Sequence, residues 1–175
     1  MSTGNRIALA GIMLALALGL GYLLSPIPNI ELMSLTLFAA GYFLGIPLGA
    51  LIGMLAFFLY SVLNPYGIAP PILLMSQVIG GAIIGVGGGI TKLFWKRLPP
   101  AVGVIVAATA GASLTLLYDI LTNIGGFIAY TSKTTIWAYL LGGIIFAITH
   151  IASNTAIFAV LFPIVARVGK RNIRF

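Results

Sequence analysis

The sequence predicts an all-α integral membrane protein with six transmembrane helices and with both termini in the cytoplasm. Hydrophobic residues make up 61% of its 175 residues and charged residues only 6%, whereas about a quarter of the residues of a soluble domain are charged. The apolar residues fall into segments that prolines and glycines separate. The lysines and arginines gather in alternate connections between these segments, which is typical of a multi-pass protein of the plasma membrane.

The apolar segments define one domain of six spans. A membrane-crossing helix needs roughly 20 mostly apolar residues. The second and third segments are short, but a single helix over both would be about 50 Å long at about 1.5 Å per residue, well beyond the ~30 Å hydrocarbon core. Pro47 in "GIPLG" separates them, because proline lacks an amide donor. Further apolar segments follow the first, so we expect a retained span and not a signal peptide. The predicted spans are 6–24, 31–45, 47–63, 71–94, 101–123 and 137–163.

The basic residues orient these spans. In the six-helix arrangement all but one of the nine lysines and arginines share one side, and only Lys133 lies opposite. Basic loops face the cytoplasm, so we interpret the net charge of +7 as a topology signal and predict no nucleic-acid binding. The residues on the shared side are Arg6, Lys92, Lys96, Arg97, Arg167, Lys170, Arg171 and Arg174.

The sequence lacks the residues that several kinds of chemistry require. There is no cysteine, and one histidine and two acidic residues lie far apart, so no metal site and no disulfide are predicted. The nucleotide-binding pattern G-x-x-x-x-G-K-[ST] is absent, and we predict no enzyme.

"GAS" at 111–113 with His150 resembles the dyad of an intramembrane serine protease, but Leu114 stands where rhomboid proteases need glycine. A channel usually repeats polar residues along its pore, and here the inner halves are nearly bare. An outward-facing binding protein is the better interpretation.

Polar residues converge on the outer half of the bundle. Ionisable groups inside spans usually face a cavity or a partner. Asp119 and Asn123 share one helix face, while His150 and Asn154 share another. The alternative is structural, with Asp119 and His150 satisfying one another or neighbouring helices. The predicted substrate-binding residues are Asn29, Glu31, Asn64, Tyr66, Gln77, Asp119, Asn123, Tyr130, Trp137, Tyr139, His150 and Asn154.

Some of these residues have two interpretations. Tyr118, Tyr130 and Trp137 form either an interfacial aromatic belt or a stacking surface for a planar ligand. In "SPIPNIELMS" at 25–34 the prolines stiffen the first outer loop. Glu31 there is either a ligand contact, a latch to Lys133, or a carboxylate that stabilises a helix N-terminus.

Small residues repeat every four positions on three of the helices. Such rows let helix backbones approach closely inside the bundle, whereas a row that faces lipid docks another membrane protein. The row of the first span is the predicted docking face, although its orientation stays open. The rows are Gly11, Ala15 and Gly19; Gly45, Gly49 and Gly53; and Gly81, Gly85 and Gly89.

Taken together, these features resemble the S components, the substrate-binding membrane subunits of energy-coupling factor (ECF) vitamin transporters. The resemblance covers the whole chain. It rests on six short helices, on "PNIELMSLTLFAAGYFLGIPLGALIG" at 28–53, on "NPYGIAPPILLMSQVIGGAIIGVGGG" at 64–89, and on small residues in the first span. The family typically carries an A-x-x-x-A motif there, and Gly11, Ala15 and Gly19 are the nearest match.

The resemblance implies a vitamin as transported substrate, with no resident cofactor. It implies a site in the outer half between the fourth and sixth helices, covered by the loops after the first, third and fifth. The first three helices would contact a transmembrane coupling subunit, the T component, driven by two cytoplasmic ATPases. "PNIE" and "NPYG-APP" look most like S components suspected of handling cobalamin or related large cofactors. Riboflavin, folate, pantothenate and thiamine precursors stay open.

Overall fold

The computed structural model describes residues 2–65, 67–131 and 133–172 of the chain, and these form an all-helical bundle. The prediction of an all-α fold with six helices is confirmed for this described part. Four helices, α1, α4, α5 and α6, are long and apolar enough to cross a membrane, whereas α2 and α3 are apolar but shorter. The helices are α1 Thr3–Leu24, α2 Met33–Leu44, α3 Ile46–Val62, α4 Pro71–Trp95, α5 Pro100–Tyr130 and α6 Ile136–Asn172.

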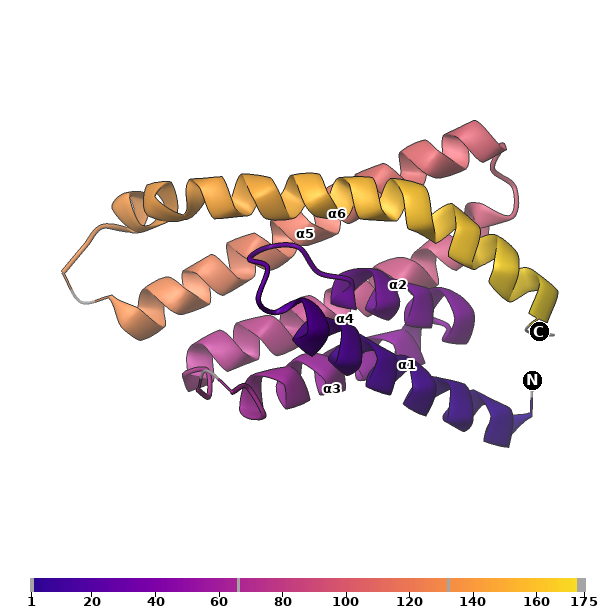
Figure 1. Ribbon diagram of the computed structural model, residues 1–175, viewed down its shortest axis with the longest axis horizontal. Coiled ribbons are helices and arrows are strands. Elements are labelled where there is room, and N and C mark those ends of the chain that lie inside the picture. The colour runs from indigo at the N-terminus through magenta and orange to yellow at the C-terminus, as the bar shows by residue number, and fades with distance from the viewer. Residues whose placement is uncertain (1, 66, 132, 173–175) are drawn as a thin grey trace.

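The two ends of the bundle differ in charge. The start of α1, the end of α6 and the α4–α5 connection lie at one end, and the α3–α4 and α5–α6 connections lie at the other (Figure 1). Arg6, Lys92, Lys96, Arg97 and Arg167 therefore share the first end, as the sequence predicts. Lys133 lies in the α5–α6 connection at the opposite end.

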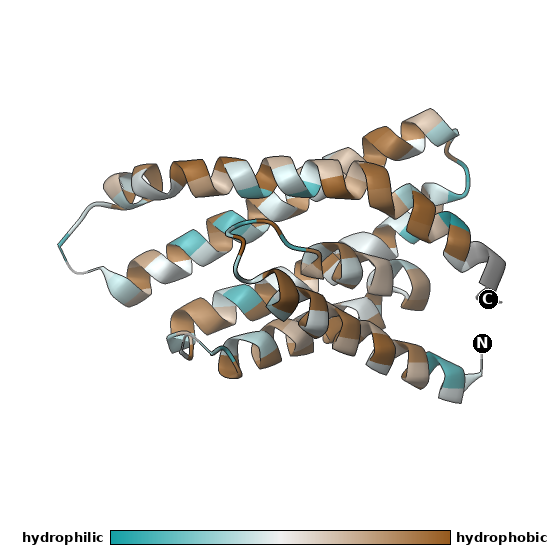
Figure 2. Cartoon of the chain, in the orientation of Figure 1, coloured by the Kyte–Doolittle hydropathy of each residue, from teal (hydrophilic) through white to brown (hydrophobic). Residues whose placement is uncertain are grey.

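The surface of the bundle is apolar. Large hydrophobic side chains such as Ile7 and Ile145 are 69% and 74% exposed, and most of each long helix is apolar (Figure 2). Water does not favour such a surface, but lipid tails do. The four long apolar helices are therefore consistent with a multi-pass membrane protein.

Helix α2 occupies the centre, and every residue of it is buried. It contacts α1, α3, α4 and α6. Its aromatic residues meet those of neighbouring helices edge to face, with ring centroids 4.8 Å apart for Phe38 and Phe162 and 5.2 Å apart for Tyr42 and Phe162. A helix that is apolar on all sides is expected to be buried, and this position fixes where the loop before α2 can lie.

The predicted break between the second and third spans is confirmed at Gly45. This residue has a φ of 92°, a left-handed conformation that glycine adopts without strain. Pro47 follows in the first turn of α3, where a missing N–H costs nothing. The second helix begins at Met33 and not at Glu31, because Glu31 stays in the loop and its side chain accepts the N–H of Ser34.

Two helices run further than their predicted spans. Helix α5 continues beyond Asn123 to Tyr130, so most of the predicted outer loop "GGFIAYTSKTT" is helical and the connection covers only 131–135. Its glycines are tolerated because Gly125 packs against Ser76 and Gly126 against Tyr139. Helix α6 continues through Pro163 to Asn172 and bends in its C-terminal part (Figure 1).

The glycine rows of α3 and α4 pack inside the bundle. A Cβ added at Gly85 would overlap the carbonyl oxygen of Gly49, and one at Gly53 would overlap that of Gly81. A Cβ at Gly41 of α2 would likewise overlap the carbonyl oxygen of Gly85. These helices touch through their backbones, as small residues allow.

The row on α1 faces outward instead. Gly11, Ala15 and Gly19 are exposed, and a Cβ at Gly11 or Gly19 would have no atom within 4 Å. The other face of α1 is the packed one, where Ala17 and Gly21 are buried. The orientation that the sequence left open is therefore settled, and this row plays no part in internal packing.

We predict that Gly85→Ala destabilises the bundle, because its methyl group would force α3 and α4 apart. Overpacking of this kind costs about 1–3 kcal/mol and occasionally more. The measurement is the melting temperature of the purified protein in detergent. Gly11→Ala is the matched control, since its methyl group meets no atom. Equal melting temperatures for the two variants would contradict the close α3–α4 contact.

Candidate functional site

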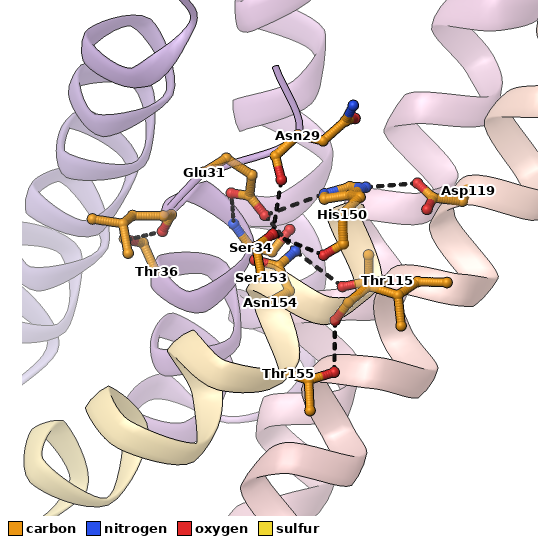
Figure 3. Close-up of polar contacts among 12 residues, drawn as sticks. Asn29, Glu31, Ser34, Thr36, Thr115, Asp119, His150, Ser153, Asn154 and Thr155 are labelled. Atoms are coloured by element: carbon orange, nitrogen blue, oxygen red, sulfur yellow. Dashed lines mark hydrogen bonds and ion pairs between the residues drawn. The ribbon is translucent and has the colours of Figure 1, made fainter. Parts of the chain in front are cut away.

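The loop between α1 and α2, residues 25–32, folds back over the bundle and is tied to α6. Asn29 in this loop has a φ of 59°, a conformation that asparagine tolerates better than most residues. Its backbone carbonyl accepts a hydrogen bond from Ser153 Oγ at 2.8 Å. Asn154 Nδ2, on the next residue of α6, donates to Glu31 Oε1 at 2.8 Å (Figure 3). Two side chains of α6 therefore hold both ends of a short loop segment.

Glu31 joins three parts of the chain. Its Oε2 accepts the backbone N–H of Ser34 at 2.7 Å, so it stabilises the N-terminus of α2 as one sequence interpretation proposed. Its Oε1 lies 3.7 Å from His150 Nε2. Burial raises the pKa of the Glu31 carboxyl, but its interactions with His150, Ser34 and Asn154 outweigh burial and hold the pKa below its usual value.

His150 lies between the two acidic residues. Its Nδ1 is 2.7 Å from Asp119 Oδ1, while its Nε2 faces Glu31 (Figure 3). The Tyr118 ring meets the imidazole edge to face, with centroids 6.3 Å apart. Asp119, His150 and Glu31 thus form a continuous polar chain from α5 through α6 to the first loop.

This cluster is incompletely satisfied. Asp119 Oδ2 and Asn154 Oδ1 are buried and have no hydrogen-bond partner among the described residues. Asn154 uses its amide nitrogen for Glu31 and for Thr115 Oγ1, 3.0 Å away. Buried polar atoms are usually paired. Asp119 and His150 do pair with one another, as the structural interpretation expects. The second carboxylate oxygen of Asp119 nevertheless stays unpaired among the described residues.

A cavity of about 200 Å³ lies between the first loop and this cluster. Its polar wall includes Asn29, Glu31, Ser34 and His150. Its aromatic wall consists of Phe57 and Tyr60 from α3 and Tyr118 from α5. The lining of the cavity therefore combines an acidic group, other polar groups and aromatic rings.

The predicted site residues divide into groups. Asn29, Glu31 and His150 line the cavity, and Asp119 and Asn154 contact its lining. Asp119 also lines a second, largely apolar hollow of about 300 Å³ between α5 and α6, together with the predicted residues Asn123 and Trp137.

The remaining predicted residues lie elsewhere. Gln77 accepts a hydrogen bond from Ser61 at 2.6 Å between α4 and α3. Tyr139 packs edge to face on Phe127, and Tyr130 is 64% exposed. Asn64 is half-buried in the α3–α4 connection and lines neither hollow. Tyr66 lies outside the described residues.

Sequence reasoning missed the aromatic wall. Phe57 and Tyr60 lie one helical turn apart on α3, a helix that carries no acidic, basic or histidine residue to draw attention to it. The proposed latch between Glu31 and Lys133 is also not formed, since no ion pair joins these two among the described residues.

The protease-like pairing of Ser113 and His150 does not occur in this conformation. Ser113 is exposed, and its Oγ donates to the carbonyl of Thr109 at 2.5 Å. Both ring nitrogens of His150 face carboxylates. A serine nucleophile needs a base within hydrogen-bond reach.

Comparison of the chain with protein-family models, with curated proteins and with solved structures found no match.

We predict that Asn154→Leu lowers stability even without ligand, because Glu31 and Thr115 each lose the donor that joins α6 to the loop and to α5. A buried group left without its partner costs about 1–3 kcal/mol. Asn123→Leu is the control, because the Asn123 amide donates only to the Asp119 carbonyl of its own helix, at 2.7 Å. The melting temperatures of the two variants in detergent are to be compared. A larger loss for Asn123→Leu would contradict the bridging role of Asn154.

Proposed function

We propose that this chain is the substrate-binding S component of an ECF-type transporter, which imports a vitamin or a related micronutrient across the plasma membrane. The observation that carries the proposal is the cavity beneath the first loop, walled by Glu31, His150 and Tyr118. The basic residues gather at the other end of the bundle, where the positive-inside rule puts the cytoplasm. The cavity then opens towards the outer half, as uptake requires.

Two further features support a substrate-binding subunit that depends on partner subunits for energy. No nucleotide-binding motif occurs in the sequence, so energy would come from two partner ATPases through a T component. The exposed row of Gly11, Ala15 and Gly19 on α1 offers a face on which another helix can approach closely.

The size of the cavity bears on the choice of vitamin. At about 200 Å³ it is smaller than the roughly 300–1,000 Å³ of pockets that hold drug-sized ligands. In this conformation it favours a small vitamin, such as a thiamine precursor or pantothenate. A cobalamin-sized cofactor would require the loop at 25–32 to move away from α6.

The direct test is to purify the full chain without its partners and to identify co-purified small molecules by mass spectrometry. We expect one vitamin-class molecule per chain, rebinding without ATP. Ser113→Ala should leave rebinding unchanged, since Ser113 Oγ bonds within its own helix. Absence of any bound or rebinding vitamin would argue against the proposal, and cleavage of a membrane protein that needs Ser113 and His150 would favour the protease alternative.

We predict that a cysteine introduced by Lys133→Cys reacts with a membrane-impermeant thiol reagent from outside intact cells. The native chain has no cysteine, so labelling reports this position alone. The reason is that Lys133 lies at the end opposite the other described basic residues. Reaction only from the cytoplasmic side would reverse the proposed topology.

We predict that Ala15→Trp abolishes uptake by the assembled transporter while the isolated chain still binds its vitamin. The bulky side chain would project from the exposed face of α1, away from the cavity, and would prevent close approach of a coupling helix. Vitamin binding and uptake are measured on the same variant. Leu16→Trp, on a neighbouring exposed position of α1, is the control for added bulk.

Two results would count against this docking face. Loss of both binding and uptake would mean that Ala15 matters for folding of the bundle. Unchanged uptake would mean that the T component binds elsewhere.

A further inference from the structure

The Glu31 carboxylate lines the cavity beneath the first loop, and the second carboxylate of the chain, on Asp119, lies behind His150. Both acidic residues of the chain, Glu31 and Asp119, belong to its polar cluster. The single histidine lies between them and can neutralise at most one of the two carboxylates. Neither lysine nor arginine lines the cavity.

Two acidic groups so close together are unfavourable in a membrane-embedded site unless each of them is paired. Ionisable groups there are normally paired, because low dielectric surroundings raise the cost of an isolated charge. Asp119 Oδ2 is buried without a hydrogen-bond partner in the described part of the chain. The described lysines and arginines lie near helix ends or in connections. Among the described residues, neither a lysine nor an arginine lines the cavity as a second cation.

The aromatic residues of the lining suit a cation as well. Phe57, Tyr60 and Tyr118 present aromatic rings to the cavity, and Phe57 and Tyr118 lie with their ring centroids 4.8 Å apart. The negative face of an aromatic ring attracts ammonium and other organic cations. A carboxylate and three aromatic rings in one lining match a cation with an apolar body.

A bare metal ion fits the same residues poorly. Metal binding needs several ligands that converge on one point. His150 instead directs Nδ1 at Asp119 and Nε2 at Glu31, on opposite sides of its ring (Figure 3). No group of three or more His, Cys, Asp or Glu side chains that could hold a metal ion occurs in the described ranges.

We infer that the cavity accepts a small organic cation, either a protonated amine or a positively charged nitrogen heterocycle, held between the Glu31 carboxylate and the rings of Tyr60 and Tyr118. This inference rests on the proposed function for its biological meaning, because it names the class of micronutrient. The binding chemistry itself follows from the charge and the walls of the cavity.

The test uses three probes of similar size that differ in charge at pH 7: benzylamine as the cation, benzyl alcohol as the neutral form and benzoate as the anion. Each is titrated by calorimetry into the full chain in lipid nanodiscs. We expect benzylamine to bind at least about 10-fold more tightly than the other two, since interactions with a charged group contribute on that order. Benzyl alcohol or benzoate binding as tightly as benzylamine, or no binding of any probe, would overturn the inference.

Substitutions test which carboxylate causes the preference for benzylamine. Glu31→Gln keeps the shape and an oxygen for Ser34 but removes the charge, so it should abolish the preference for benzylamine. If Glu31→Gln melts at a lower temperature than the native chain, Asp119→Asn replaces it and should weaken the preference. Lys133→Gln is the control, because it changes a charge outside the cavity lining and should leave the preference intact. A preference that survives both acidic substitutions would overturn the inference.

The inference and the proposed function fail in different ways. A neutral or anionic vitamin that co-purifies with the chain and is taken up by the assembled transporter would uphold the proposed transport function and overturn the inference of a cationic ligand. A preference for benzylamine without uptake in the presence of any coupling subunit would uphold the cationic ligand and overturn the transport function.

Discussion

The close backbone contact of α4 with α2 and α3 is the constraint on which the rest of the structure depends. Gly85 sits against Gly49 and Gly41 with no room for a Cβ on any of them. In a bilayer the helices gain little from hiding apolar surface from lipid, so close packing has to hold them together. This contact keeps α2, a helix of 12 residues, in the middle of longer helices.

The position of α2 determines the site. Because α2 is short and central, the chain must return from α1 into the interior before α2 begins. Glu31 therefore lies inside the bundle, within reach of His150 and Asn154 on α6. The same carboxylate stabilises the start of α2 through Ser34. Folding of the core and formation of the cavity wall thus share one side chain, and the loop cannot leave the cavity without releasing hydrogen bonds to α6.

The sequence predicts what depends on local chemistry and misses what depends on distant contacts. Apolar segments, Pro47 and the glycine at 45 correctly separate α2 from α3. The small-residue rows predict close packing, but their spacing does not say that the row of α1 faces outward while that of α4 faces inward. Gly125 and Gly126 read as a loop, yet contacts with Ser76 and Tyr139 accommodate them in a helix. The pairing of Glu31 with Asn154 joins residues 123 positions apart, and no local pattern encodes it.

The polar cluster is not fully paired within the described part of the chain. Polar side chains that serve only to hold helices together are expected to satisfy one another, because every unpaired buried polar atom weakens the bundle. Ser61 and Gln77 behave in this way, because they form a hydrogen bond with each other between α3 and α4. Asp119 and Asn154 each keep a buried oxygen without a partner among the described residues, close to Glu31 and His150 in the cavity lining. The two acidic residues and the one histidine of the chain thus meet where α5, α6 and the first loop come together, and their incomplete pairing supports the binding site proposed above.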